Sequence, residues 1–220
     1  MSQQTKTRIQ QAAMHLFKEQ GYAATNLQDV AKASEMARRN VVYHFPDKTE
    51  LLNAILEEMW IRLEMERART RAFPSFKNIQ KEVEFYRKVR AEYDFVFSDI
   101  HLLRQPRIRE KFEAMAAQSI KDNKASIAFA IKIGNMKPEP MPGIYSNLAK
   151  SVWVLSITWF SDFLSEDPQR YEKEEKMIWS MLLPHFTEKG IKAFKVFFGA
   201  DYYDSLGEPF DEELKKLSTF

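Results

Sequence analysis

The clearest chemistry in this sequence is contact with nucleic acid, carried by basic, amide and aromatic side chains between residues 38 and 48. An arginine can donate two hydrogen bonds to O6 and N7 of guanine, and an asparagine can bond N6 and N7 of adenine. Tyrosine, histidine and lysine can bind phosphate oxygens, which set the register of a protein on DNA without reading its sequence. The side chains of these kinds are Arg38, Arg39, Asn40, Tyr43, His44 and Lys48.

Three short helices are expected to position these side chains. Apolar residues at helical spacing predict the first helix over about residues 5–20. Asn26 can cap a second helix that ends near residue 33, and a third is expected over about residues 37–44. Two helices joined by a tight turn describe a helix-turn-helix unit, which places its second helix in the DNA major groove. We add Asn26 and Gln28, at the start of the second helix, to the candidate DNA-binding residues.

The rest of the chain is also expected to be helical, which makes the predicted fold class all-α. Only 6 of the 220 residues are glycine, and no region alternates with the period of two that strands require. The segment GNMKPEPMPG, residues 134–143, predicts a loop, and Pro184 is expected to kink or split the last helix. The later predicted helices cover about residues 47–70, 77–103, 106–133 (as one helix or two), 145–164 and 168–198.

The composition excludes several classes of protein. The chain is 45% apolar and 29% charged, which is ordinary for a globular protein. It has no cysteine, so disulfides and thiolate metal sites are excluded, and its four histidines form no ligand motif. No charged and apolar leader and no apolar run of about 18 residues is present, so we expect a soluble, cytoplasmic protein without a membrane span. We expect no cofactor and no metal ion.

Two stretches, QQAAMHLFKEQGYAATNLQDVAKAS and NVVYHFPDKTELL, resemble the N-terminal DNA-binding domain of the TetR family of transcriptional regulators. The resemblance covers about residues 5–56. It implies a homodimer that binds a palindromic double-stranded DNA operator, with a larger, all-helical ligand-binding and dimerisation domain after the helix-turn-helix domain. We therefore expect a DNA-binding domain at residues 1–50, a helical domain at residues 51–220, and a ligand-responsive regulator, most simply a repressor.

Three residues depart from the pattern of that family. Glu35 stands in the turn where the family usually has glycine, and Ala37 stands where a serine usually caps the recognition helix. Val42 replaces an aromatic residue that touches phosphate in the family. The loss of a serine cap costs roughly 1 kcal/mol, and Glu35 brings a negative charge close to the DNA. These departures bear on the operator sequence and on affinity.

Aromatic residues of the later helices suggest a site for a small, mainly apolar effector. Such residues at helical spacing also fit a plain core or a dimer interface. A histidine and an arginine that follow an apolar helix can bind a polar group of an effector, or they can complement the negative end of the helix dipole. The candidate ligand-binding residues are Phe97, His101, Arg104, Trp153 and Trp159.

The helices expected at 145–164 and 168–198 carry more apolar and aromatic side chains than the surface of one domain can expose. They predict a two-fold interface, a four-helix bundle to which each chain contributes two helices.

Two other functions remain as alternatives. The first is an all-helical dimeric module that binds small molecules without specific DNA recognition, which Glu35 and Ala37 favour. The second, an enzyme, is least favoured because the sequence contains no nucleophile elbow, glycine-rich phosphate loop, HExxH or paired-carboxylate motif. Among the DNA-binding candidates, Tyr43 and His44 also fit a partly buried core edge, and Arg38 and Arg39 also fit a solvated helix face.

Overall fold

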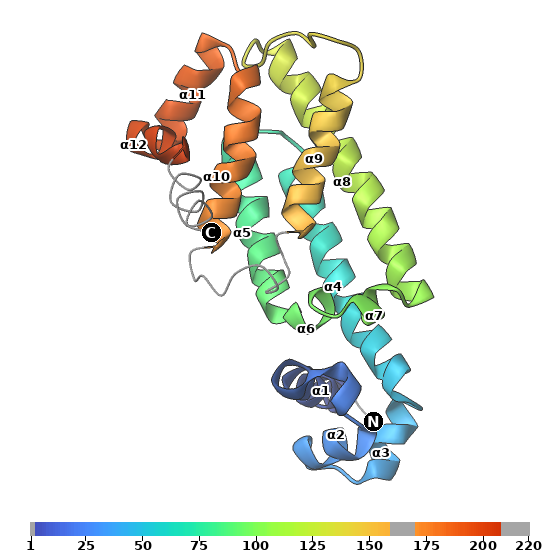
Figure 1. Ribbon diagram of the computed structural model, residues 1–220. Coiled ribbons are helices and arrows are strands. Elements are labelled where there is room, and N and C mark those ends of the chain that lie inside the picture. Colours follow the sequence, from blue (N-terminus) through green and yellow to red (C-terminus); the bar gives the residue numbers. More distant parts are fainter. Residues whose placement is uncertain (1–2, 159–169, 208–220) are drawn as a thin grey trace, which may run out of the picture. The chain divides into compact units, whose positions relative to one another are not determined.

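The computed structural model describes residues 3–158 and 170–207, and within these ranges every regular element is a helix (Figure 1). The all-α class expected from the sequence is therefore confirmed. The first helices are α1 (Gln3–Ala24), α2 (Leu27–Ala33), α3 (Arg38–His44), α4 (Lys48–Thr70), α5 (Phe76–Glu92), α6 (Asp94–Phe97) and α7 (Ile100–Leu103). The later ones are α8 (Pro106–Lys132), α9 (Ile144–Thr158), α10 (Arg170–Leu182), α11 (Glu188–Phe198) and α12 (Ala200–Asp204), with 3₁₀ turns at Leu183–His185 and Ser205–Gly207.

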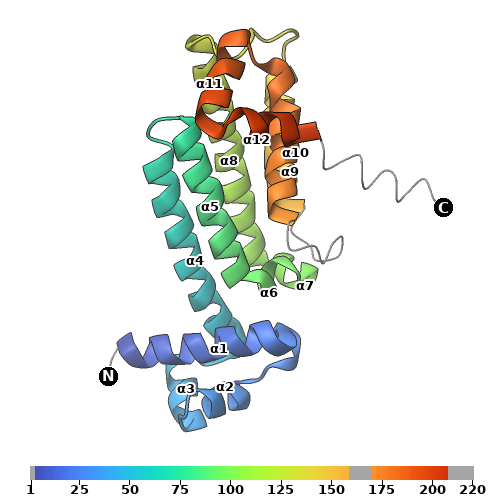
Figure 2. The same cartoon turned by 90° about the vertical axis from the view of Figure 1, so that its left-hand side faces the viewer.

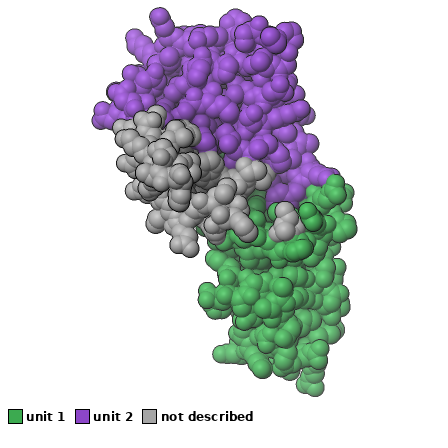
Figure 3. All heavy atoms as spheres, viewed as in Figure 1, with its two compact units in different colours: residues 1–69, 82–111 green, residues 70–81, 112–220 purple. Residues whose placement is uncertain are grey.

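The chain packs as two compact units (Figure 3). Unit 1 comprises residues 1–69 and 82–111, and unit 2 comprises residues 70–81 and 112–220. Three helices, α4, α5 and α8, therefore have residues in both units, although α4 contributes only Thr70 to unit 2. The functional boundary expected at residue 50 is a separate matter and stays a prediction.

The N-terminal three helices of unit 1 form around a small apolar core. In both views α1 lies across α2 and α3 (Figure 2). Residues spaced by three and four along α1 turn one face inward, which removes their apolar surface from water. The Phe17 ring lies 5.2 Å from Tyr22 and 5.4 Å from Phe95, measured between ring centroids. The fully or nearly fully buried members of this core are Ile9, Ala13, Phe17, Val30, Ala31, Val41 and Phe45.

The single helix expected over residues 77–103 is wrong, because the chain forms α5, α6 and α7 there. Tyr93, with φ −114° and ψ 27°, leaves helical geometry after α5. Asp99 then accepts hydrogen bonds at Oδ1 from the main-chain N–H of His101 (2.8 Å) and Leu102 (3.3 Å), which starts a new helical turn. An apolar stripe does not reveal such breaks, since the broken segments still bury Tyr93, Phe95 and Leu102.

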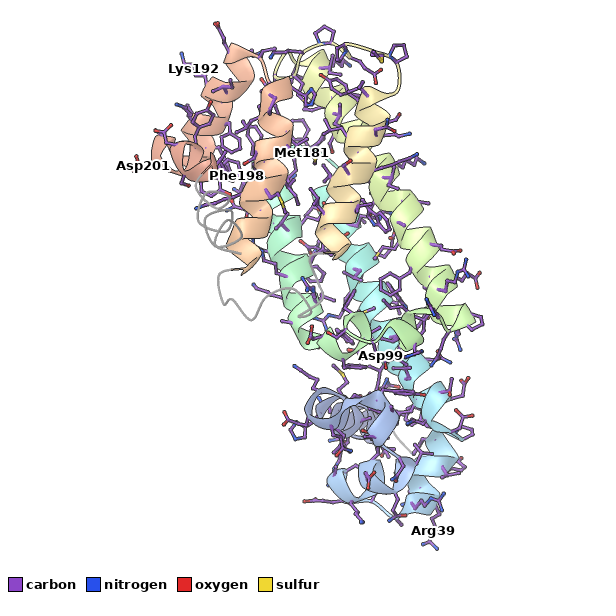
Figure 4. The ribbon with its side chains drawn as sticks, viewed as in Figure 1. Arg39, Asp99, Met181, Lys192, Phe198 and Asp201 are labelled. Carbon is purple, nitrogen blue, oxygen red and sulfur yellow. The ribbon has the colours of Figure 1, made fainter. Side chains whose placement is uncertain are left out.

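Unit 2 is built around an aromatic cluster that includes Phe76, Trp179, Phe186, Phe194 and Phe198. The Phe76 ring contacts the others at centroid distances of 5.7 to 6.2 Å, and Phe194 and Phe198 approach to 4.5 Å. Figure 4 shows Phe198 directed from α11 towards α10, where Met181 is labelled. Burial of so many rings against one another holds α11 on the unit.

Pro184 splits the helix expected over residues 168–198, as predicted, into α10, a 3₁₀ turn and α11. Thr187 caps α11, because its Oγ1 accepts from the N–H of Gly190 at 3.1 Å. Thr187 Oγ1 also donates to the carbonyl of Gly134 at 2.7 Å, which ties the expected loop at 134–143 to the start of α11. Only glycine fits at position 190, since a β-carbon there would lie 2.0 Å from the carbonyl oxygen of Asn135.

Candidate nucleic-acid interface

The start of α2 is held by a reciprocal cap. Asn26 Oδ1 accepts from the N–H of Gln28 at 2.8 Å and of Asp29 at 3.1 Å, and Asp29 Oδ2 accepts from the N–H of Asn26 at 3.1 Å. This is a capping box, which leaves few main-chain donors unsatisfied. Asn26 and Gln28 are both exposed, so they remain accessible at this helix end. The Asn26 oxygen is already committed to the cap, and its amide nitrogen is the group that it can offer to a partner.

The turn between α2 and α3 has a left-handed residue that is not glycine. The N–H of Met36 donates to the carbonyl of Ala31 at 2.9 Å, and the N–H of Glu35 donates to the carbonyl of Lys32 at 3.0 Å. This pair of bonds is the Schellman motif, which requires a positive φ at the position that Glu35 occupies. Glu35 has φ +51°, a conformation that costs a residue with a β-carbon about 1–2 kcal/mol.

Glu35 also forms an ion pair across the helix-turn-helix unit. Its Oε2 accepts from Arg8 Nη2, on α1, at 2.6 Å. The Arg8 and Glu35 side chains are 51% and 82% exposed, and ion pairs so exposed add about 0–1 kcal/mol of stability. The pair therefore does not outweigh the cost of the left-handed backbone, and stability gives no reason for a glutamate in this turn.

Helix α3 turns a polar face to solvent. Arg38, Arg39 and Asn40 are exposed, and Tyr43 is 77% exposed, whereas Val41 on the opposite side is fully buried. Figure 4 shows Arg39 extending away from unit 1. Val41 anchors the helix while the other side chains stand free of the core, which is the arrangement that a recognition helix requires.

The two ends of α3 differ in how they are closed. At its start Ala37 makes no side-chain cap, as its residue type dictates. At its end the N–H of Phe45 donates to the carbonyl of Val41 at 2.8 Å, and Phe45 is buried. His44 is half-buried, with its ring 5.2 Å from the Tyr43 ring. The run Tyr43, His44 and Phe45 thus passes from solvent into the core.

Lys48 has an intramolecular role that its sequence position did not suggest. Its Nζ donates to the main-chain carbonyls of Tyr22 and Thr25, both at 2.7 Å, and to that of Ala23 at 3.3 Å. The ammonium also lies 4.2 Å from the centroid of the Tyr22 ring. Partial burial lowers the pKa of Lys48. These bonds use all three donors of the ammonium group and tie the start of α4 to the last residues of α1 and to Thr25, which follows α1.

The candidate ligand-binding residues fall in different parts of the chain. Phe97, at the end of α6, is partly buried, whereas the side chains of His101 and Arg104 are exposed; all three belong to unit 1. Trp153 lies on α9 in unit 2, and Trp159 lies outside the described residues. A common pocket for these residues stays a prediction.

Trp153 is the candidate with an unusual environment. Its indole Nε1 is buried and has no hydrogen-bond acceptor among the described residues. One turn earlier on α9, the carbonyl of Ala149 accepts from Asn123 Nδ2 at 3.2 Å, and Asn123 Oδ1 accepts from Arg71 Nη2 at 3.3 Å. A buried donor without an acceptor is rare in folded proteins, which sets Trp153 apart from the other candidates that the structure describes.

Other kinds of site find no support in the described part of the chain. No group of three or more histidine, aspartate or glutamate side chains is arranged there to hold a metal ion. None of the helices in that part is long and apolar enough to cross a membrane. A depression of 430 Å³ on α11 is lined by Glu188, Ile191, Lys192, Lys195 and Val196, all from that one helix, so it is a feature of the surface.

Comparison with known sequences agrees with the geometry of the N-terminal helices. The profile described as "Bacterial regulatory proteins, tetR family" matches residues 9–55. The HTH-type transcriptional regulator AcrR of Shigella flexneri is 38% identical over 56 residues, 26% of each chain. The HTH-type transcriptional regulator TtgR of Pseudomonas putida is 34% identical over 58 residues, 26% of this chain and 28% of its own. The match thus spans about a quarter of these curated relatives.

Comparison with solved structures extends the similarity of fold to most of the chain. A TetR-family regulator from Marinobacter aquaeolei VT8 superposes with a TM-score of 0.76 at 16% identity, over 92% of this chain and 99% of its own. The SmeT–triclosan complex gives 0.64 at 16% identity, over 84% and 93%. A γ-butyrolactone receptor described as ArpA-like gives 0.62 at 15% identity, over 92% and 98%.

Proposed function

Residues 9–55 match the model of the TetR family, and from this premise we propose that the chain is a TetR-family, ligand-responsive transcriptional regulator without catalytic activity. It acts as a homodimer on a palindromic operator, most simply as a repressor. A regulator of this kind works where the chromosome is, so we expect it in the cytoplasm.

The observation that carries this proposal is the exposed face of α3. Arg38 and Asn40 are exposed beside a buried Val41, so both can reach base edges without disturbing the core. Arg39, Tyr43 and His44 flank them and can bind phosphate or further base edges. Each well-formed two-bond contact discriminates between bases by about 1–3 kcal/mol.

For Lys48 we favour a positioning role over a phosphate contact. The ammonium already donates to Tyr22, Ala23 and Thr25, and a phosphate would have to displace at least one of these acceptors. By holding the segment before α2, Lys48 fixes where Asn26 and Gln28 stand. The charge of Lys48 still favours DNA at long range, but its main effect is on the shape of the unit.

Assembly as a dimer is supported by apolar surface on the later helices. Val154 on α9 is 42% exposed, and on α11 Val196 is 81% and Phe197 39% exposed. A second copy of the chain that covers these side chains removes that surface from water. Two recognition helices in such a dimer bind half-sites about one DNA turn, roughly 34–36 Å, apart.

The effector is a small, mainly apolar molecule with at least one hydrogen-bond acceptor. The buried indole N–H of Trp153 supplies a donor for that acceptor. The SmeT complex with triclosan is an example of a protein of this fold that binds an aromatic compound of this kind. Ligand and operator oppose each other through a coupling that is typically 1–3 kcal/mol in allosteric proteins.

Selection of bound fragments from genomic DNA of the source organism tests the DNA-binding function. We expect a palindromic consensus, and we expect Arg38→Ala and Asn40→Ala to relax the preference at single base pairs. Arg69→Ala is the matched control, because Arg69 is an exposed residue of unit 1 near the far end of α4. If the selected fragments shared no consensus sequence, the alternative would be favoured, a dimeric module that binds small molecules only. The carboxylate of Glu35 and the uncapped start of α3 are the features that support this alternative.

A further inference from the structure

We propose that Glu35 holds Arg8 in an intramolecular ion pair that competes with a DNA phosphate, and thereby weakens binding to DNA of every sequence. This inference rests on the proposed DNA-binding function. It assigns a role to a residue that is unfavourable in the turn where it stands and unfavourable in charge beside a polyanion.

The first step is the position of the pair. Glu35 lies in the turn directly before α3, three residues from Arg38, so it stands next to the face that we assign to DNA. Arg8 reaches that turn from α1, with its Nη2 2.6 Å from the Glu35 carboxylate. A cation that can contact this turn can also reach a phosphate lying beside it.

The second step is chemical competition. A guanidinium group binds carboxylates and phosphates through the same planar arrangement of donors. The pair is exposed on both sides, so solvent and DNA can approach it. While Glu35 neutralises Arg8, this cation releases no counterion from DNA, and one phosphate contact is lost from the electrostatic part of binding.

The expected result follows from the salt dependence. Glu35→Gln removes the carboxylate charge and keeps the length of the side chain. Its slope of log affinity against log salt should steepen by about 0.9, so the variant loses about 3.5-fold more affinity than the wild type between 50 and 200 mM salt. At low salt its affinity should rise by the same factor for operator and for random-sequence DNA, since phosphate contacts carry no sequence information.

The matched control is Glu64→Gln. Glu64 pairs with Arg67 on α4, in the same unit but about 24 Å along the helix from Lys48. The substitution makes the same change in net charge and removes one ion-pair partner from an arginine far from α3, so the salt slope should stay that of the wild type.

Two double variants identify the cation. Arg8→Ala with Glu35→Gln should return to the wild-type slope, because the released guanidinium is absent. Lys18→Ala with Glu35→Gln has the same net charge but retains Arg8, and Lys18 is an exposed residue of α1. This second variant should keep the steeper slope.

The experiment measures fluorescence anisotropy of labelled operator and labelled random DNA with the full-length protein, after circular dichroism has shown that each variant is folded. A wild-type slope for Glu35→Gln overturns the inference and leaves the DNA-binding function standing. A steep slope that persists without Arg8 also overturns it, because another cation is then responsible. If the wild type and all variants fail to bind DNA at low salt, the proposed function itself fails, and the inference fails with it.

Discussion

Lys48, at the start of α4, donates a 2.7 Å hydrogen bond to the main-chain carbonyl of Tyr22, which lies next to Gly21 near the end of α1. The two residues are 26 positions apart in the sequence. Their contact, together with the bonds from Lys48 to Ala23 and Thr25, closes the helix-turn-helix unit on itself. A lysine that looks like a phosphate ligand in the sequence thus binds main-chain carbonyls of the unit that it helps to shape.

Substitution of this lysine separates the two roles. Lys48→Met keeps most of the side-chain length but removes the ammonium. We expect the free energy of unfolding of unit 1 to fall by about 1.5–3 kcal/mol, the value of a hydrogen bond to a charged group. Operator affinity should fall while the salt slope stays unchanged. Urea denaturation and anisotropy titrations measure these quantities, with Lys18→Met as the exposed control. Unchanged stability with a slope reduced by about one phosphate would instead make Lys48 a DNA ligand.

The left-handed backbone at Glu35 predicts that glycine at this position makes the protein more stable than alanine does. Glu35→Gly and Glu35→Ala both remove the ion pair with Arg8, but only glycine relieves the strain of a β-carbon at φ +51°. The glycine variant should be more stable than the alanine variant by about 1 kcal/mol. Thermal or urea unfolding of the two proteins checks the difference. Equal stabilities would mean that the turn carries no such strain.

The missing cap of α3 predicts that a capping residue at position 37 increases the free energy of unfolding. Ala37 has extended backbone angles, φ −66° and ψ 139°, and makes no side-chain bond. A serine hydroxyl there can accept from a main-chain N–H of the first turn, so Ala37→Ser should add about 1 kcal/mol to the free energy of unfolding. Ala33→Ser, in the last turn of α2, is the control that offers no N-cap. If both serine substitutions change the free energy of unfolding equally, the absence of a cap does not limit the stability of α3.

The close packing around Gly190 predicts that substitution of this residue destabilises unit 2. A β-carbon at this position would lie 2.0 Å from the Asn135 carbonyl oxygen, and both groups are main chain or next to it, so neither can rotate away. Gly190→Ala should cost about 1–3 kcal/mol, as overpacking does, and should raise hydrogen exchange in α11 and in the loop at 134–143. Lys192→Ala, on the exposed side of the same helix, should change stability by less than about 0.5 kcal/mol. If Gly190→Ala left stability and hydrogen exchange unchanged, the close approach of residue 190 to the Asn135 carbonyl would be contradicted.

Exposed apolar side chains on α9 and α11 predict the dimer interface. At micromolar concentration, sedimentation should report twice the mass of one chain. Val196→Glu, at a residue that is 81% exposed on α11, should shift the protein towards monomer because a charge is costly in an apolar interface. Ile61→Glu is the control, since Ile61 is 53% exposed on α4 in unit 1. A dimer that tolerates Val196→Glu would place the interface elsewhere.

The sequence by itself determined the features that depend on neighbours within one or two helical turns. The apolar spacing of Ile9, Ala13 and Phe17 predicted the buried face of α1, and all three residues are fully buried. Asn26 could be identified as a cap because the groups that it binds lie two and three residues ahead. Pro184 could be identified as a break because proline lacks the donor that a continuous helix requires. Such signals are local, because all the residues on which each one depends are neighbours in the sequence.

Only the tertiary structure decided the contacts that join distant segments. Arg8 meets Glu35 across 27 positions and Lys48 meets Tyr22 across 26, and nothing in the residue types selects these partners from the other charges and carbonyls of the chain. Gly190 likewise follows from an approach to Asn135, 55 positions earlier in the sequence. The break at Asp99 escaped prediction because the apolar stripe continues through it. The three long-range contacts share one physical reason: each depends on how helices pack, which brings together groups that periodicity along the chain leaves unrelated.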